Sequence, residues 1–244
     1  MDPLLSLKGV NKSFGALTVS DNVTFDLPKG QALGIIGPNG AGKSTLFNLI
    51  GGALPPSSGQ VMFKGQDVTA QPASTRCRSG IARSFQIPHP FIGMTVYENL
   101  LVASSFGGAG HADQREACHD ILERTGLLAK ANRPAGSLTL LERKRLELSR
   151  ALATGPELLL LDEIAGGLTE AECHALVETI QSIHASGVSI IWIEHIVHAL
   201  LAVVDRLIVI DFGKIVAEGE PRAVMADPMV QEIYMGISVD DQAA

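Results

Sequence analysis

One eight-residue segment constrains the fold of this chain more than any other, namely Gly37-Pro-Asn-Gly-Ala-Gly-Lys-Ser44. It matches GxxxxGK[S/T] at every fixed position, follows the apolar run Ala32–Ile36 and opens a segment of helical character that reaches Ile50. Glycines let the backbone curl so that successive N–H groups face inward and can hold phosphate oxygens. The segment therefore predicts a buried strand, a phosphate-binding loop and a helix, a context that a chance glycine-rich turn would lack.

The loop supplies ligands for a nucleoside triphosphate with its metal ion. We expect Lys43 to reach the β- and γ-phosphates, the Ser44 hydroxyl to ligate Mg²⁺ and Thr45 to support it. The positive N-terminal end of the following helix adds to the attraction for phosphate. The predicted cofactors are ATP and Mg²⁺, and the predicted nucleotide-binding residues of this segment are Gly37, Pro38, Asn39, Gly40, Ala41, Gly42, Lys43, Ser44 and Thr45.

Two adjacent carboxylates end a second buried strand far downstream. The run Leu158–Leu161 is entirely apolar, and Asp162 and Glu163 follow it directly. A strand end beside the phosphate loop would place Asp162 where it can hold Mg²⁺, directly or through water. Glu163 would then orient or deprotonate the attacking water. The alternative is a strand that simply meets solvent at two acids.

Composition and charge exclude several classes of protein. Hydrophobic residues make up 46% of the 244 residues and charged residues 18%, which predicts a large buried sheet or apolar surface kept for partners. The net charge of −7 predicts no nucleic-acid partner. Three scattered cysteines without a CxxC pair indicate a reducing compartment. No segment reaches the about 18–20 uncharged apolar residues of a membrane span, so we expect only peripheral membrane contact.

The order of apolar segments predicts an α/β fold with a P-loop NTPase core, a mainly parallel sheet with flanking helices. We expect a single domain over residues 1–244. Residues 1–87 and 153–236 form the core, which includes an N-terminal antiparallel β-subdomain. Residues 88–152 form an inserted α-helical subdomain, with a flexible break at Gly107–Gly110, and residues 237–244 form a disordered tail.

Individual elements follow from periodicity and from turn and cap residues. Thr95–Glu98 resembles a capping box, and Leu54–Gly59 is expected to be a turn. Helices are expected over Thr169–Ala185 and His195–Val203. The expected strands are Leu4–Val10, Leu17–Leu27, Ala32–Ile36, Val61–Phe63, Ile81–Phe85, Leu158–Leu161, Val188–Ile193, Leu207–Asp211 and Ile215–Ala217.

Nearly the whole chain resembles the nucleotide-binding subunit of an ABC transporter, because the order phosphate loop, glutamine, signature, Asp-Glu and histidine is met. Gln86, after the strand Ile81–Phe85, matches the family's Q-loop glutamine, which implies contact with Mg²⁺ or the attacking water. His195 matches the switch histidine, which implies contact with the γ-phosphate. By this resemblance the catalytic residues are Glu163, His195, Lys43 and Gln86, and the metal ligands are Ser44, Gln86 and Asp162.

Two further segments occupy positions that the family uses. Phe14, in VNKSFG, stands where the family places an aromatic ring that stacks on adenine, although a core phenylalanine remains the alternative. Residues Ala165–Thr169 stand in the D-loop, and Thr169 occupies a position where the family usually has Asp or Asn.

A narrower resemblance points to the subfamily that serves branched-chain amino acid importers. It rests on the segments Gly80–Gln86 (GIARSFQ), Phe91–Ala103 and Ile193–Pro221. The resemblance implies import of hydrophobic amino acids or related compounds delivered by a solute-binding protein. It also implies two different ATPase subunits, and the extended loop before Gln114 is similar to the longer of them.

The signature segment departs from the family pattern LSGGQ. The chain reads Leu138-Thr-Leu-Leu-Glu142, so Thr139 keeps a hydroxyl for the nucleotide, Leu141 replaces a glycine and Glu142 replaces a glutamine. In one interpretation the backbone N–H groups still face phosphate and the change is tolerated. In the other, which we favour as a hypothesis, the leucine crowds the nucleotide, the acid repels it, and this half-site is weak.

The implied machine is a dimer that closes on two ATP molecules. Its partners would be transmembrane permease subunits and a second ATPase subunit, identical or different, on the cytoplasmic face of the inner or plasma membrane. Two alternatives stay open: a soluble ABC-type ATPase of DNA repair or translation, and a nucleotide-binding regulatory module without turnover. The retained Glu163 and His195 argue against the second of these.

Overall fold

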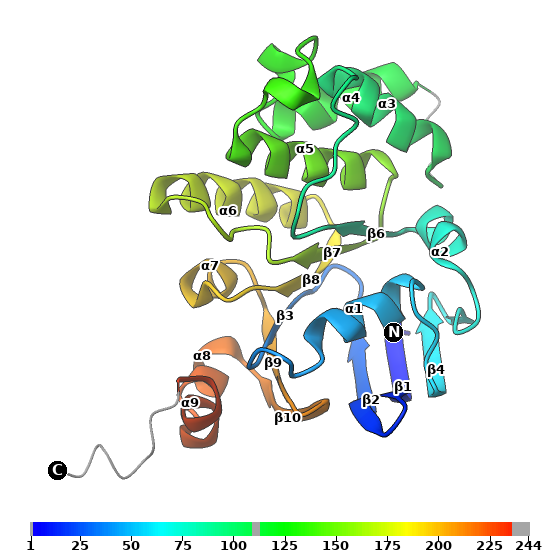
Figure 1. Cartoon of the computed structure of the whole chain (residues 1–244), viewed down its shortest axis with the longest axis vertical. Helices are drawn as coiled ribbons and strands as arrows, with labels where there is room; N and C mark the ends of the chain where they lie inside the picture. The colour runs from blue at the N-terminus through cyan, green and yellow to red at the C-terminus, as the bar shows by residue number, and fades with distance from the viewer. Residues whose placement is uncertain (1, 109–112, 236–244) are drawn as a thin grey trace, which may run out of the picture.

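Two β-sheets organise the fold, as the computed structural model shows over residues 2–108 and 113–235 (Figure 1). A four-stranded sheet has the order β2-β1-β4-β5, and a six-stranded sheet has the order β10-β9-β3-β8-β7-β6. The strands are β1 (Leu5–Phe14), β2 (Leu17–Leu27), β3 (Ala32–Ile36), β4 (Ser58–Phe63), β5 (Gln66–Asp67), β6 (Ile81–Ser84), β7 (Leu158–Asp162), β8 (Ser189–Ile193), β9 (Arg206–Asp211) and β10 (Lys214–Gly219).

Helices cover both faces of the larger sheet and form a group beyond it (Figure 1). They are α1 (Lys43–Gly51), α2 (Ala73–Ser79), α3 (Val96–Phe106), α4 (Gln114–Arg124), α5 (Leu140–Ala153), α6 (Glu170–Ala185), α7 (Val197–Leu201), α8 (Pro221–Met225) and α9 (Pro228–Met235). Short 3₁₀ turns occur at Leu128–Lys130 and Ala135–Ser137.

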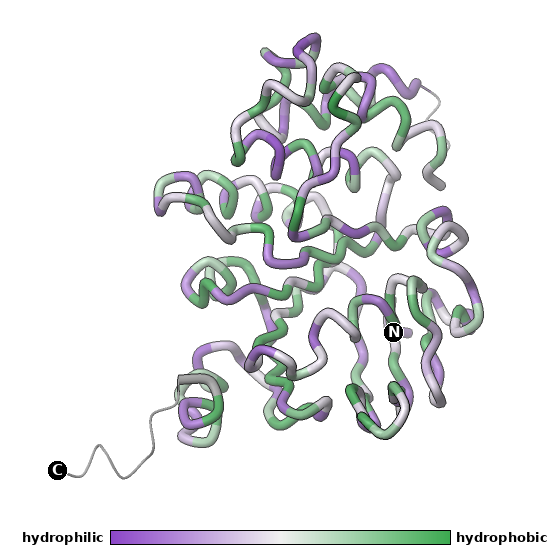
Figure 2. The backbone as a smooth tube through the Cα atoms, viewed as in Figure 1, coloured by the Kyte–Doolittle hydropathy of each residue, from purple (hydrophilic) through white to green (hydrophobic). Residues whose placement is uncertain are grey.

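The six-stranded sheet is parallel except for β10, which pairs antiparallel with β9. Its central strands β3, β7 and β8 are buried along their whole length, because successive side chains point to opposite sides and both sides are covered. In β7, Leu159 and Leu161 join the core beneath the helices α5 and α6, while Leu158 and Leu160 join the core that contains α1 and the small sheet. Figure 2 shows this concentration of apolar residues along the central strands. The predicted α/β class and mainly parallel sheet are confirmed.

The small sheet is the antiparallel sheet that the sequence predicts at the N-terminus, with two boundary corrections. The pairing of β1 with β2 runs from Leu5 opposite Leu27 to Phe14 opposite Leu17. The first strand therefore continues to Phe14 instead of ending at Val10, and irregularities in its register interrupt it. The turn expected over Leu54–Gly59 is too long, because the strand β4 already begins at Ser58, which pairs with Asn11 of β1.

The helices α3, α4 and α5 pack against one another at one end of the molecule (Figure 1). The capping box predicted at Thr95 and Glu98 is present at the start of α3. The proposed division into a core and an insertion over residues 88–152 stays a prediction. Residues 109 and 110 of the expected break and the expected tail 237–244 lie outside the described residues.

One predicted helix is shorter than expected, and one helix was not predicted. The helix expected over His195–Val203 is only Val197–Leu201, because the backbone N–H groups of His195 and Ile196 are bound by the carboxylate of Glu194. The helix α2 was not predicted, because it is short and polar. The buried Arg76 holds α2 in place by donating to the carbonyl oxygens of Leu49, Ile50, Thr69 and Gln71.

Candidate functional site

The phosphate loop connects the end of β3 to the start of α1, as predicted. Its glycines are required by close backbone approaches. A Cβ on Gly37, at a φ of 153°, would lie 2.0 Å from the carbonyl oxygen of Ile210, and one on Gly42, at a φ of 102°, would lie 2.3 Å from that of Val19. Gly42 is the N-cap of α1 and supplies no side-chain acceptor, so the first turn of the helix keeps backbone donors for a ligand.

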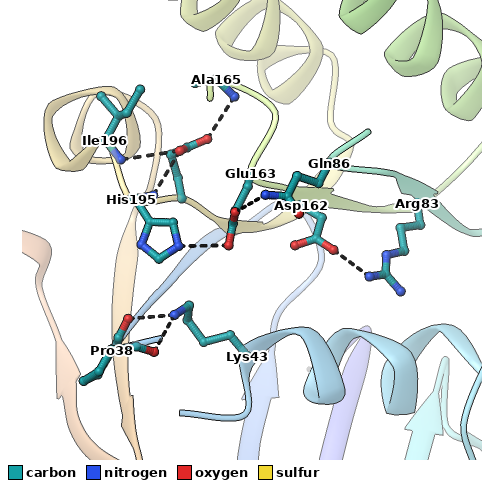
Figure 3. A network of polar contacts seen from close by, with 11 residues as sticks. Pro38, Lys43, Arg83, Gln86, Asp162, Glu163, Ala165, His195 and Ile196 are labelled. Carbon is teal, nitrogen blue, oxygen red and sulfur yellow. Dashed lines mark hydrogen bonds and ion pairs between the residues drawn. The ribbon is translucent and has the colours of Figure 1, made fainter. Parts of the chain in front are cut away.

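Lys43 is folded back onto the loop (Figure 3). Its Nζ donates to the carbonyl oxygens of Gly37 at 2.7 Å and Pro38 at 2.8 Å, and the side chain is buried. Burial lowers the pKa of Lys43 from its ordinary value, while the nearby carboxylates of Glu163 and Asp162 oppose that shift. The loop thus holds a positive charge whose present partners are neutral carbonyl groups.

A cavity of 230 Å³ lies over this loop. It brings the loop together with Glu163, the second of the two acids that end β7. The residues that line it are Val19, Asn39, Gly40, Gly42, Lys43, Ser44, Thr45 and Glu163. Pro38 and Ala41 line a neighbouring cavity instead, which Phe212 also lines.

Three side chains that are far apart in the sequence meet at the carboxyl edge of the parallel sheet (Figure 3). The Nε2 of Gln86, beyond β6, donates to Oε2 of Glu163 at 2.6 Å. The Nε2 of His195, beyond β8, lies 2.9 Å from Oε1 of Glu163. Glu163 has a φ of 47°, a conformation that is uncommon outside glycine. Adjacent parallel strands end at one edge of a sheet, which explains why this glutamine, acid and histidine converge.

Asp162 has a partner that the sequence analysis missed. The Nη2 of Arg83, in β6, lies 2.6 Å from Oδ2 of Asp162, and both side chains are largely buried. An arginine inside the largely buried strand Ile81–Ser84 was the available signal, because a charge in a buried strand requires a partner.

Glu194 is a second functional candidate that sequence reasoning missed. Its side chain is buried and accepts hydrogen bonds from the backbone N–H groups of Ala165 at 3.0 Å, His195 at 3.0 Å and Ile196 at 3.4 Å. One carboxylate therefore anchors the loop after Glu163 and the loop that carries His195. The signal was a single acid at the end of the apolar run Ser189–Ile193.

Phe14 is not a core residue, so that alternative is wrong. Half of its surface is exposed, and the Nζ of Lys12 lies 5.3 Å from the centre of its ring. The ring does not line the cavity over the phosphate loop. Its proposed contact with adenine remains a prediction.

The signature segment begins α5, and none of its residues lines the cavity over this chain's own phosphate loop. Thr139 is the N-cap, and its Oγ1 accepts from the backbone N–H of Glu142 at 3.4 Å, while the Glu142 carboxylate accepts from the backbone N–H of Thr139 at 3.0 Å. Glu142 also pairs with Lys130. Leu141 packs against the main core, whereas Leu140 is exposed. Two backbone N–H groups at the start of α5, those of Thr139 and Glu142, are therefore already bound by its own side chains.

Within residues 2–108 and 113–235, no helix is both long and apolar enough to span a bilayer. The same residues contain no group of three or more His, Cys, Asp and Glu side chains arranged to hold a metal ion by themselves.

Sequence relatives and solved structures agree with this geometry. LivG of Escherichia coli K12, a high-affinity branched-chain amino acid transport ATP-binding protein, is 35% identical over 96% of this chain and 98% of its own length. BraF of Pseudomonas aeruginosa, of the same description, is 34% identical over 96% of this chain and 98% of its own length. The ADP conformation of MJ1267, an ATP-binding cassette of an ABC transporter, superposes with a TM-score of 0.89 at 34% identity, covering 97% and 100% of the two chains.

The ABC transporter family model matches residues 20–166, which hold the phosphate loop, Gln86 and the Asp162–Glu163 pair. Residues beyond that match, including His195, are covered by the full-length relatives. This chain therefore belongs to the ABC transporter family, as one of its ATP-binding and ATP-hydrolysing subunits.

Proposed function

We propose that this chain hydrolyses MgATP to drive an importer of branched-chain or related hydrophobic amino acids. The observation that carries the hydrolytic part is the convergence of Gln86 and His195 on the carboxylate of Glu163, beside the cavity over the phosphate loop. The solute class rests on LivG and BraF, whose names assign them to branched-chain amino acid transport.

The triphosphate would lie in the cavity over the phosphate loop. The backbone N–H groups between Gly37 and Thr45 would hold its oxygens, and Lys43 would exchange its two carbonyl partners for the β- and γ-phosphates. A charged partner that also accepts hydrogen bonds would offset the burial that lowers the pKa of Lys43. Phe14 would stack on the adenine ring.

The donor set fits Mg²⁺, which binds through one or two protein oxygens together with substrate phosphates instead of a complete protein cage. The Ser44 hydroxyl and the Asp162 carboxylate would hold it, with Gln86 close by. Bound there, the ion neutralises charge on the phosphates. Arg83 fixes one oxygen of Asp162.

Glu163 would accept a proton from the attacking water or orient that water. Its contacts with Gln86 and His195 hold the carboxylate in one position. Because Gln86 and His195 come from separate loops, a movement of either loop would change the position of the catalytic carboxylate.

The permease subunits would dock at a groove of 310 Å³ between α2, β6, α3 and α5. Its wall is mainly apolar and includes Ala73, Cys77, Phe85, Ala103 and Ala151. Phe85 immediately precedes Gln86, so the occupant of this groove would lie next to the catalytic cluster. The docked chain would then lie on the cytoplasmic face of the inner or plasma membrane, indirectly served by a solute-binding protein.

A second ATPase subunit would complete each nucleotide site. The capped first turn of α5, with its acidic Glu142, supports the hypothesis that this chain's signature is the weaker half of the pair. The chain would then pair with a different ATPase subunit whose signature faces this chain's phosphate loop.

The test is sedimentation of Glu163→Gln with and without MgATP, alongside turnover of the assembled transporter. We expect nucleotide binding to persist and turnover to fall by roughly 10²–10⁴-fold, the usual contribution of a general base. Glu178→Gln, an exposed acid on α6, is the matched control and should hydrolyse ATP at the wild-type rate. Full turnover in Glu163→Gln would remove the assigned role. An ATP-dependent dimer of this variant would argue for two working signatures, and a monomer that binds ATP would support a different partner.

A further inference from the structure

Arg83 lies between the groove and the acid that would hold Mg²⁺. Its guanidinium donates through Nη2 to Oδ2 of Asp162 at 2.6 Å and through Nη1 to Oδ1 of Asn48 at 2.6 Å (Figure 3 shows the first contact). The same residue contributes to the wall of the 310 Å³ groove. One side chain therefore touches α1, the end of β7 and the space where a partner would dock.

Two aromatic rings hold the guanidinium in this position. Its Cζ lies 5.1 Å from the ring centre of Phe85 and 5.6 Å from that of Phe47. Phe47 is fully buried in α1 and is fixed, whereas Phe85 is half exposed in the groove wall. Cation–π contact depends on how the cation and the ring are placed. A change at Phe85 therefore reaches Arg83 more readily than a change at Phe47.

The hydrogen bonding of Arg83 is incomplete. Within residues 2–108 and 113–235, its buried Nε has no hydrogen-bond partner. A buried donor without an acceptor lowers the stability of the arrangement that contains it. In the arrangement that contacts Asp162, the Nε–H donor of Arg83 is thus left without an acceptor. A shift of the guanidinium that gave Nε an acceptor would change the hydrogen bond to the Asp162 carboxylate.

We propose that Arg83 is a positioning residue that couples the groove to the Mg²⁺ site. It orients Asp162 through Oδ2, and Phe85 sets the position of Arg83, so that the affinity of the site for Mg²⁺ depends on the groove wall. The proposal rests on the proposed function, since it requires Asp162 to hold the metal and the groove to receive the permease. Partners that orient a ligating carboxylate commonly contribute about 10–100-fold to metal affinity.

The experiment measures metal binding and nucleotide binding separately on the full-length subunit. A fluorescent ADP analogue is titrated first in EDTA and then with Mg²⁺, and Mn²⁺ binding to the ADP complex is followed by electron paramagnetic resonance. We expect Arg83→Met to bind ADP in EDTA within about twofold of wild type and to need about tenfold more Mg²⁺ or Mn²⁺ for half saturation. Arg83→Lys keeps the charge and should recover part of the loss. Arg78→Met, an exposed arginine on α2, is the matched control.

The variant Phe85→Ala tests whether the groove wall affects metal binding. We expect it to weaken Mn²⁺ binding by about threefold, and to add nothing when combined with Arg83→Met, since residues that act through one contact are not additive. Should Arg83→Met fail to fold, Arg83→Lys and Phe85→Ala still decide the outcome.

The positioning role is overturned if Arg83→Met binds Mn²⁺ with wild-type affinity. If Arg83→Met does not fold, the same result in both Arg83→Lys and Phe85→Ala overturns it. Full additivity of Arg83→Met with Phe85→Ala overturns the coupling to the groove. A wild-type chain that binds no ADP would instead contradict the proposed function, so the two failures are distinguishable.

Discussion

The N-termini of α1 and α5 are both expected to face phosphate, yet their first turns are built differently. The cap of α1 is Gly42 in a left-handed conformation, without a side-chain acceptor and without an acid in the first turn. The cap of α5 is Thr139, which forms a capping box with Glu142. The first turn of α1 therefore offers free donors to an anion, whereas side chains of α5 already bind the backbone N–H groups of Thr139 and Glu142 and add a negative charge.

The other capping boxes show what kind of start α5 has. The helices α3 and α6 begin with Thr95 and Glu98 and with Thr169 and Glu172, in the same arrangement as α5. No nucleotide-binding role is assigned to either of these helices in this chain. The start of α5 thus resembles a structural helix end more than a phosphate site. Substitutions at the start of α1 and at the start of α5 test this difference.

The largest effect is expected from Lys43→Met at the start of α1. Because the variant removes the positive charge of the phosphate site, we expect turnover in the assembled transporter to fall by roughly 10²–10³-fold. Lys8→Met, an exposed lysine on β1, is the control and should leave turnover unchanged. Turnover of Lys43→Met within twofold of wild type would show that the loop does not bind phosphate in the way proposed.

An intermediate effect is expected from opening the start of α5. Leu140→Gly with Glu142→Gln removes an exposed leucine and the acid of the first turn, and leaves the packed Leu141 in place. In the Glu163→Gln background we expect the ATP-dependent homodimer to tighten about tenfold, or about 1.4 kcal/mol, by sedimentation over a concentration series.

The matched control for α5 is Glu172→Gln, which changes the corresponding acid at the start of α6 and should leave self-association unchanged. The single change Leu141→Gly is less informative, because the loss of packing lowers stability as well. If the doubly changed protein associates no better than its parent, the signature of this chain is not weakened by these residues.

The smallest effect is expected from the caps themselves. Thr139→Ala and Thr169→Ala should each lower the free energy of unfolding by about 1 kcal/mol in urea denaturation, because each removes one side-chain acceptor at a helix start. Thr139→Ala should also lower turnover in the assembled transporter, whereas Thr169→Ala should not. Equal turnover in both variants would place α5 with the purely structural helices.

The elements that were predictable are those whose own residues determine them. The apolar run Ala32–Ile36 and the alternating run Leu17–Leu27 became strands with the predicted bounds, and the phosphate loop follows from its glycine spacing. The convergence of Gln86, Glu163 and His195 was expected only from the family order of motifs. It is a consequence of strand order, which places β6, β7 and β8 side by side.

The elements that were missed depend on partners distant in the sequence. The helix α2 has no apolar periodicity, and it is held by Arg76 through carbonyl groups of α1 and the preceding loop. The pair of Arg83 and Asp162 joins residues 79 positions apart. No local pattern specifies such a contact, although a lone charge in a buried strand marks where one is needed.

The shared anchor at Glu194 has a mechanical consequence for the catalytic edge. The loop that follows Glu163 and the loop that carries His195 both donate hydrogen bonds to the buried Glu194 carboxylate. The donors are the backbone N–H groups of Ala165, His195 and Ile196. If either loop moved alone, it would withdraw donors from a buried charge, an unfavourable change of roughly 1–3 kcal/mol or more. The two loops are therefore expected to move together, so that a displacement of the loop that carries His195 is transmitted through Glu194 to the loop that follows Glu163.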